Sequence, residues 1–114
     1  MVTLTAGTVV LIRFPFSDLS QSKVRPALVL AEAGNDEWIL CQITSNPYAD
    51  ARALPLLQVA FQSGGLRKDS FARPSKLFTA HVSLVSGRAG QLLPHQFRRV
   101  VEATINTLTE SLTH

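Results

Sequence analysis

Residues 26 to 44 read PALVLAEAGNDEWILCQIT, which is two apolar runs on either side of a Gly34-Asn35-Asp36 turn. Gly, Asn and Asp favour tight turns because these residues tolerate positive φ angles. The runs from Pro26 to Ala31 and from Trp38 to Thr44 have the length and the residue types of buried strands. The stretch therefore predicts a pair of neighbouring antiparallel strands.

Further strands are predicted on both sides of this pair. Residues 8 to 14, TVVLIRF, form a β-branched run that begins after Gly7 and is followed by Pro15. Residues 16 to 24 are mostly polar and predict a loop. Residues 54 to 57, LPLL, indicate an edge strand, because proline cannot donate a hydrogen bond to a ladder. Residues 70 to 78 predict a fifth strand.

The last segment predicts a helix. Pro94 suits a first helical position. Apolar residues then recur every three or four positions at Phe97, Val101, Ile105, Leu108 and Leu112. This spacing predicts one apolar stripe along an amphipathic helix. The expected fold class is mainly β with helices, a small antiparallel β-barrel or curled sheet with a C-terminal α-helix packed against it.

The composition fits one compact domain spanning residues 1–114, with 46% hydrophobic and 17% charged residues. The net charge is +3, and residues 61 to 114 hold seven Lys and Arg against three Asp and Glu. This asymmetry is typical of a surface that meets phosphate or an acidic partner. An ordinary solvated face explains it equally well.

Several site classes find no support in the residues. Cys41 is the only cysteine, so neither an internal disulfide nor a cysteine-based zinc site is expected. The sequence has no paired histidines at metal spacing, no carboxylate cluster and no phosphate-cradling glycine loop, and we expect neither metal nor cofactor. It also lacks a secretory signal and an apolar run of ~18 residues. A soluble, cytoplasmic protein is therefore expected.

Two polar segments beside the predicted strands are candidate sites. Arg25 follows a polar loop and precedes a buried strand, where its planar donors match a phosphate group. The alternative is a surface ion pair with Asp18 or Glu32. Residues 42 to 46, QITSN, end a strand in two hydroxyls and an amide, which suit phosphate oxygens. The alternative there is a turn or cap. For each segment taken alone, the structural alternative is a simpler explanation than a phosphate-binding site.

The order of these segments resembles the PemK/MazF family of toxins from type II toxin–antitoxin systems. The resemblance rests on GTVVLI at 7–12 with FPF at 14–16, KVRPALVL at 23–30 and ITS at 43–45. It continues through GGL at 64–66, KDS at 68–70 and RPSKLFT at 73–79. Each of these short motifs is common in unrelated proteins. Together they occur in the family's order over nearly the whole chain, which makes the resemblance specific.

This resemblance implies an SH3-like barrel, a homodimer, a cognate antitoxin and metal-independent cleavage of single-stranded RNA. The family's usual catalytic pair falls on Arg25 and Thr44. Some members carry an acid two residues after the arginine that matches Arg73. Ser75 stands at that place, which argues against an Asp-based mechanism. The predicted substrate-binding residues are Phe16, Ser17, Lys23, Pro26, Ser45, Asn46, Arg73, Ser75 and Lys76.

Metal-free cleavage of RNA needs a 2′-hydroxyl that attacks its own phosphate, an acceptor for its proton, a donor for the leaving oxygen, and cations. Arg25 suits the cationic role, but its very high pKa makes it a poor proton donor and a poor acceptor. Its expected role is therefore to stabilise the transition state, with acid work only secondary. Thr44 would orient a phosphate oxygen. The pKa range of histidine suits a base, yet His81, His95 and His114 all lie outside the candidate segments.

A second class of function stays open from the sequence. A barrel of the same build could bind nucleic acid or a protein without cutting anything, as gyrase-poisoning toxins related to this family do. The Arg25 and Thr44 pair favours the enzyme, because a gyrase binder would not need it.

Overall fold

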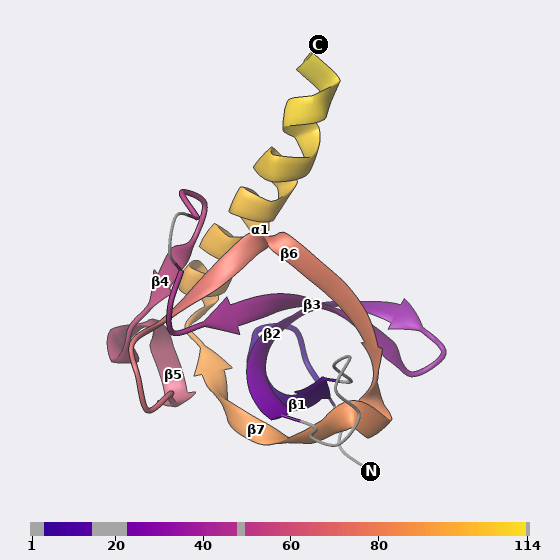
Figure 1. Ribbon diagram of the computed structural model, residues 1–114, viewed down its shortest axis with the longest axis vertical. Coiled ribbons are helices and arrows are strands. Elements are labelled where there is room, and N and C mark those ends of the chain that lie inside the picture. The colour runs from indigo at the N-terminus through magenta and orange to yellow at the C-terminus, as the bar shows by residue number, and fades with distance from the viewer. Residues whose placement is uncertain (1–3, 15–22, 48–49, 114) are drawn as a thin grey trace.

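The computed structural model describes residues 4–14, 23–47 and 50–113. In this part of the chain one antiparallel sheet of seven strands curls into a nearly closed barrel (Figure 1). The strands are β1 (Thr8–Phe14), β2 (Lys23–Gly34), β3 (Glu37–Thr44), β4 (Leu54–Leu56), β5 (Phe61–Gly64), β6 (Ser70–His81) and β7 (Val85–Leu92). Their order in the sheet is β4-β6-β3-β2-β1-β7-β5. The predicted fold class is confirmed.

The pairing of β2 with β3, which the sequence predicted, is confirmed. Leu28 lies opposite Cys41, and Asn35 and Asp36 in the turn both have positive φ, 54° and 60°. Strand β2 is longer than predicted at both ends. Its first residues pair with β1, as Phe14 does with Lys23, so residues 23 and 24 belong to the strand and not to the predicted loop.

The sequence did not predict β5 and β7, although β7 is the strand that pairs with β1 and β5. Its sequence VSGRAGQL contains two glycines, which are depleted in strands. At Gly90 the strand passes so close to β5 that a Cβ atom would lie 2.5 Å from the carbonyl oxygen of Ser63. Glycine is therefore required by the close approach of the two strands.

The core has two clusters of buried side chains, and β2 contributes to both. Leu28 packs with Val9 and Cys41, whereas Val29 packs with Val10 in the other cluster. Successive strand residues point to opposite faces of a sheet. Strand β2 is therefore covered on both faces, which fixes its register strongly.

Helix α1 (Pro94–Thr109) covers the first of these clusters, through Val100 and Phe97. The short 3-10 helices are η1 (Gln58–Ala60), η2 (Val82–Leu84) and η3 (Glu110–Thr113). The predicted apolar stripe is wrong in its second half, because Ile105, Leu108 and Leu112 are 51%, 62% and 80% exposed. The helix extends beyond the sheet, so its last turns have no barrel to pack on (Figure 1).

Within the described residues, no helix combines the length and the apolar character that crossing a membrane would need.

Candidate active site

Thr44 is the last residue of β3 and lies opposite Phe71 of β6. Its Oγ1 atom accepts a hydrogen bond from the backbone N–H of Asn46 at 3.1 Å and lies 3.2 Å from the carbonyl oxygen of that residue. The hydroxyl thus forms the turn that ends the strand, as the simpler interpretation held. The same contacts fix it at the strand end.

Arg25 lies on the neighbouring strand, near the same end of the barrel. Ala27 pairs with Gln42, and continuing this register by two residues along each strand brings Arg25 level with Thr44. The two-residue period of strands puts both side chains on the same face. The two predicted catalytic residues therefore lie on adjacent strands, each two residues beyond the last pair of the β2–β3 ladder, Ala27 with Gln42.

One of the two alternative partners of Arg25 is too distant. Glu32 lies seven residues further along β2, which corresponds to about 23 Å at roughly 3.3 Å per residue. Asp18 lies outside the described residues. The proposed surface ion pair with Glu32 is wrong.

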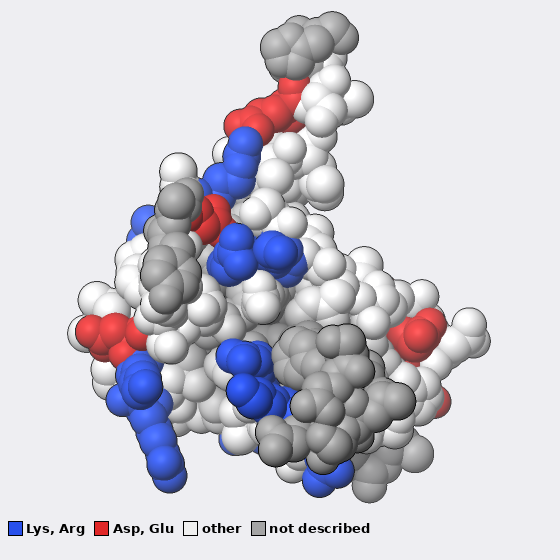
Figure 2. Space-filling model, viewed as in Figure 1, with Lys and Arg blue, Asp and Glu red and all other residues white. Residues whose placement is uncertain are grey.

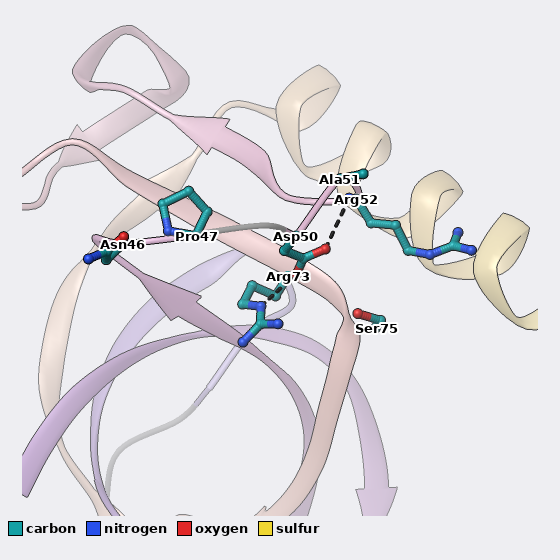
Figure 3. Close-up of a pocket in the computed structure, with 7 residues that line it drawn as sticks. All are labelled: Asn46, Pro47, Asp50, Ala51, Arg52, Arg73 and Ser75. Atoms are coloured by element: carbon teal, nitrogen blue, oxygen red, sulfur yellow. Dashed lines mark hydrogen bonds and ion pairs between the residues drawn. The ribbon is translucent and has the colours of Figure 1, made fainter.

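An open pocket of about 530 Å³ lies beside the end of β3 (Figure 3). It brings together three predicted substrate-binding residues, Asn46, Arg73 and Ser75. Residues that the sequence did not single out complete its lining: Pro47, Asp50, Ala51 and Arg52. The pocket joins the turn after β3 to the middle of β6.

The strongest contact in the pocket is an ion pair between Arg73 and Asp50. Arg73 Nε donates to Asp50 Oδ2 at 2.6 Å, and Arg73 Nη1 lies 3.4 Å from Gln42 Oε1. The Asp50 side chain is 9% exposed. The hydrogen bond from Arg73, together with one from the backbone N–H of Arg52, lowers the pKa of Asp50. A carboxylate held ionised in this way is a poor proton acceptor.

Arg52 ties the same segment to helix α1. Its Nη1 atom lies 3.2 Å from Thr107 Oγ1 and 3.2 Å from Glu110 Oε1. Hydrogen bonding between the two charged groups raises the pKa of Arg52 and lowers that of Glu110. Both side chains are solvent-exposed, so the pair positions the segment and contributes little stability.

The other predicted substrate-binding residues are more scattered. Lys76 lines a separate hollow of about 210 Å³ with Gln42, Leu77 and Phe78. The two hollows adjoin, since Gln42 contacts Arg73. Lys23 and Ser45 are exposed, and Pro26 is half-buried beside Arg25. Phe16 and Ser17 lie outside the described residues.

The histidines do not enter the site. His81 pairs with Glu37 at the opposite end of β3 from Thr44, and its Nδ1 atom accepts a hydrogen bond from the backbone N–H of Ser83 at 3.1 Å. His95 lies exposed in the first turn of α1. His114 lies outside the described residues. No candidate base among the described histidines faces the pocket.

Cys41 is fully buried, and its thiol lies 3.1 Å from the carbonyl oxygen of Arg73. Burial raises the pKa of this thiol from 9.0 to about 12. Because the thiolate is the reactive form, Cys41 is an inert core residue and no nucleophile at neutral pH.

The described part of the chain holds no group of three or more His, Cys, Asp or Glu side chains placed to bind one metal ion. Lys and Arg side chains lie in several separate groups over the barrel, and acidic side chains lie on the projecting helix and at both sides of the barrel (Figure 2). This face therefore offers phosphate scattered cations, without one continuous basic stripe.

Comparison with known proteins points to one family. Residues 5–108 match the sequence profile described as the PemK-like, MazF-like toxin of type II toxin–antitoxin systems. Solved structures with a similar fold include MazE–MazF from Deinococcus radiodurans, at 18% identity, a TM-score of 0.75 and coverage of 95% of this chain and 97% of that one. No curated protein sequence matches the chain.

Two mycobacterial structures are also similar. The Mycobacterium tuberculosis toxin MazF-mt6 is 20% identical, with a TM-score of 0.68 and coverage of 89% of this chain and 95% of that one. An endoribonuclease in complex with its cognate antitoxin is 11% identical, with a TM-score of 0.67 and coverage of 94% and 93%. At these identities the likeness shows the fold.

The buried thiol predicts a specific loss of stability at alkaline pH. The folded-state pKa of Cys41 lies above the ordinary value, so its contribution is complete below pH 9.0 and is lost as the pH rises toward 12. Urea unfolding from pH 8 to 10.5 should show wild type losing more stability than Cys41→Ala, with a difference in slope of up to about 1.4 kcal/mol per pH unit. Identical slopes would contradict a protonated buried thiol.

Proposed function

This chain belongs to the family of PemK-like, MazF-like toxins of type II toxin–antitoxin systems, and we propose that it is an endoribonuclease that cuts single-stranded RNA. We propose further that residues 1–114 act as one toxin domain in the cytoplasm, where cleavage of messenger RNA stops translation and growth.

The observation that carries the proposal is the shared end of β2 and β3, near which Arg25 and Thr44 lie, together with the pocket that contains Arg73 and begins just after β3. The strand register supports it, because Ala27, two residues after Arg25, pairs with Gln42, two residues before Thr44. A phosphodiester at this end of the barrel would meet a cation from β2, a hydroxyl from β3 and a second cation from β6. A barrel that only binds a protein would not need two cations and a hydroxyl at one end.

The proposed reaction is attack by a 2′-hydroxyl on the adjacent phosphorus. The bond from phosphorus to the 5′-oxygen breaks, and that oxygen takes a proton from solvent water, giving a 2′,3′-cyclic phosphate and a 5′-hydroxyl. Arg25 stabilises the charge that develops on the phosphate oxygens. Thr44 donates its hydroxyl hydrogen to one of those oxygens, in place of its contact with the carbonyl oxygen of Asn46.

The proton of the 2′-hydroxyl has no strong acceptor among the residues that line the pocket. Asp50 is their one carboxylate, and its hydrogen bond to Arg73 lowers its pKa. We infer that solvent water takes this proton and that turnover is slow. Slow turnover suits a toxin whose substrate is abundant.

We propose that the reaction needs no metal ion. Arg25 and Arg73 supply the positive charge that a metal would otherwise bring to the phosphate, and an arginine stays charged at any physiological pH. Ser75, which lines the same pocket, binds a phosphate oxygen by its hydroxyl.

A cognate antitoxin and a homodimer complete the proposal. One similar mycobacterial structure is described as an endoribonuclease with its cognate antitoxin, and the Deinococcus radiodurans structure contains MazE with MazF. By analogy we propose that an acidic or amphipathic antitoxin segment occupies the pocket that contains Arg73 and excludes RNA from it.

Arg25→Ala should keep the fold and reduce cleavage of an unstructured RNA at least roughly 100-fold, because one preorganised donor to the transition state is lost. Cleavage is measured on labelled RNA in gels. Arg99→Ala, which removes an exposed arginine from α1, is the matched control and should cut as wild type does. Equal cleavage by wild type and Arg25→Ala would remove Arg25 from the reaction. RNA that is bound but never cut by wild type would favour the binding module.

The exposed apolar end of α1 predicts self-association. Ile105, Leu108 and Leu112 are each at least half exposed, and an apolar patch of this kind is stabilised by a second copy. Sedimentation at micromolar concentration should show a dimer that dissociates on dilution. Leu108→Lys should shift it to monomer, whereas Asn106→Lys on the polar side should not. A wild-type monomer at these concentrations would contradict the dimer.

A further inference from the structure

The pocket beside β3 contains the carboxylate of Asp50 at the place where RNA phosphates are proposed to bind. An acid in such a place repels the substrate. Asp50 is nevertheless turned inward, with its side chain 9% exposed, and it contacts Arg73 at 2.6 Å. Its carboxylate is hydrogen-bonded to the guanidinium of Arg73 (Figure 3).

The atoms used in this contact decide how Arg73 is presented. Asp50 binds Nε, the nitrogen nearest the backbone, and the terminal nitrogens point away from the carboxylate (Figure 3). Nη1 has a long contact of 3.4 Å with Gln42, and no hydrogen bond from the described residues reaches Nη2. The terminal nitrogens form the planar fork that matches two phosphate oxygens.

Asp50 is itself held firmly. Its Oδ1 accepts the backbone N–H of Arg52 at 3.0 Å, and its own backbone N–H donates to the carbonyl oxygen of Pro47 at 3.0 Å. The Arg52 side chain is hydrogen-bonded to Thr107 of α1. A continuous series of polar contacts therefore runs from the helix through residues 50–52 to the guanidinium of Arg73.

We propose that Asp50 is a positioning residue, which fixes the guanidinium of Arg73 so that its terminal nitrogens bind one phosphate group of the RNA. This inference rests on the proposed function. Preorganisation reduces the ordering cost of binding, and a flexible arginine on a strand would otherwise sample many rotamers. The repulsion between the Asp50 carboxylate and the RNA is offset by the orientation that this carboxylate enforces on Arg73.

The proposal and simple electrostatics predict opposite signs for one substitution. Asp50→Asn raises the charge of the pocket by one unit. If the pocket acts only as a local charge, RNA binding and cleavage should improve. If Asp50 positions Arg73, both should weaken despite the added positive charge. Asp36→Asn makes the same change of charge in the turn between β2 and β3, far from the pocket, and is the matched control.

Cleavage of an unstructured RNA pool is the first measurement, with Asp50→Asn, Asp50→Glu, Asp36→Asn and wild type compared at one ionic strength. We expect Asp50→Asn to be at least about tenfold slower, Asp36→Asn to be unchanged, and Asp50→Glu to recover part of the rate. Thermal melting checks that each variant is folded. Cleavage by Asp50→Asn at or above the wild-type rate would overturn the inference while leaving the proposed function intact.

Nuclear magnetic resonance separates the two proposals if wild type does not cut RNA. Inorganic phosphate is added to labelled protein, and the Nε–H signal of Arg73 is followed in wild type and in Asp50→Asn. A wild-type signal that shifts with phosphate, and needs several-fold more phosphate in Asp50→Asn, supports the positioning role even without cleavage. Equal responses in the two proteins, or none in wild type, would overturn it.

Discussion

The pairing of β2 with β3 is the interaction on which the rest of the structure depends. Both faces of β2 are buried, Leu28 in one cluster and Val29 in the other, so a slip of one residue would exchange the two sets of side chains. The same register, continued by two residues beyond the pair of Ala27 and Gln42, would bring Arg25 level with Thr44. Core packing and the alignment of the proposed catalytic pair are thus one constraint.

The site lies where this pairing ends and the chain leaves the barrel. Thr44 closes β3 by binding the backbone of Asn46, and the segment that follows returns across β6, where Asp50 meets Arg73. The pocket therefore combines a rigid strand end with a polar segment that is tied to α1 through Arg52. Strand β6 supplies Arg73 to the pocket, and the connecting segment supplies Asp50 and Arg52.

The sequence predicted those parts of the fold that have a simple period. Runs of β-branched and apolar residues revealed β1, β2, β3 and β6, and the resemblance to a family placed Arg25 and Thr44. Strand β7 was missed because Gly90 is selected by a close approach to β5 and weakens the strand pattern. Asp50 was missed because its partner lies 23 positions away. Leu108 was wrongly expected to pack against the barrel, because the spacing of apolar residues along a helix does not show where the barrel ends.

The chemistry of the cut ends tests the central claim most directly. Purified protein is incubated with a mixed pool of unstructured RNA in the presence of a metal chelator, and both new termini are mapped at each cut. The account predicts cleavage at a short defined sequence, with a 2′,3′-cyclic phosphate on one fragment and a 5′-hydroxyl on the other. No cleavage under these conditions, or fragments ending in 3′-hydroxyl and 5′-phosphate, would contradict it.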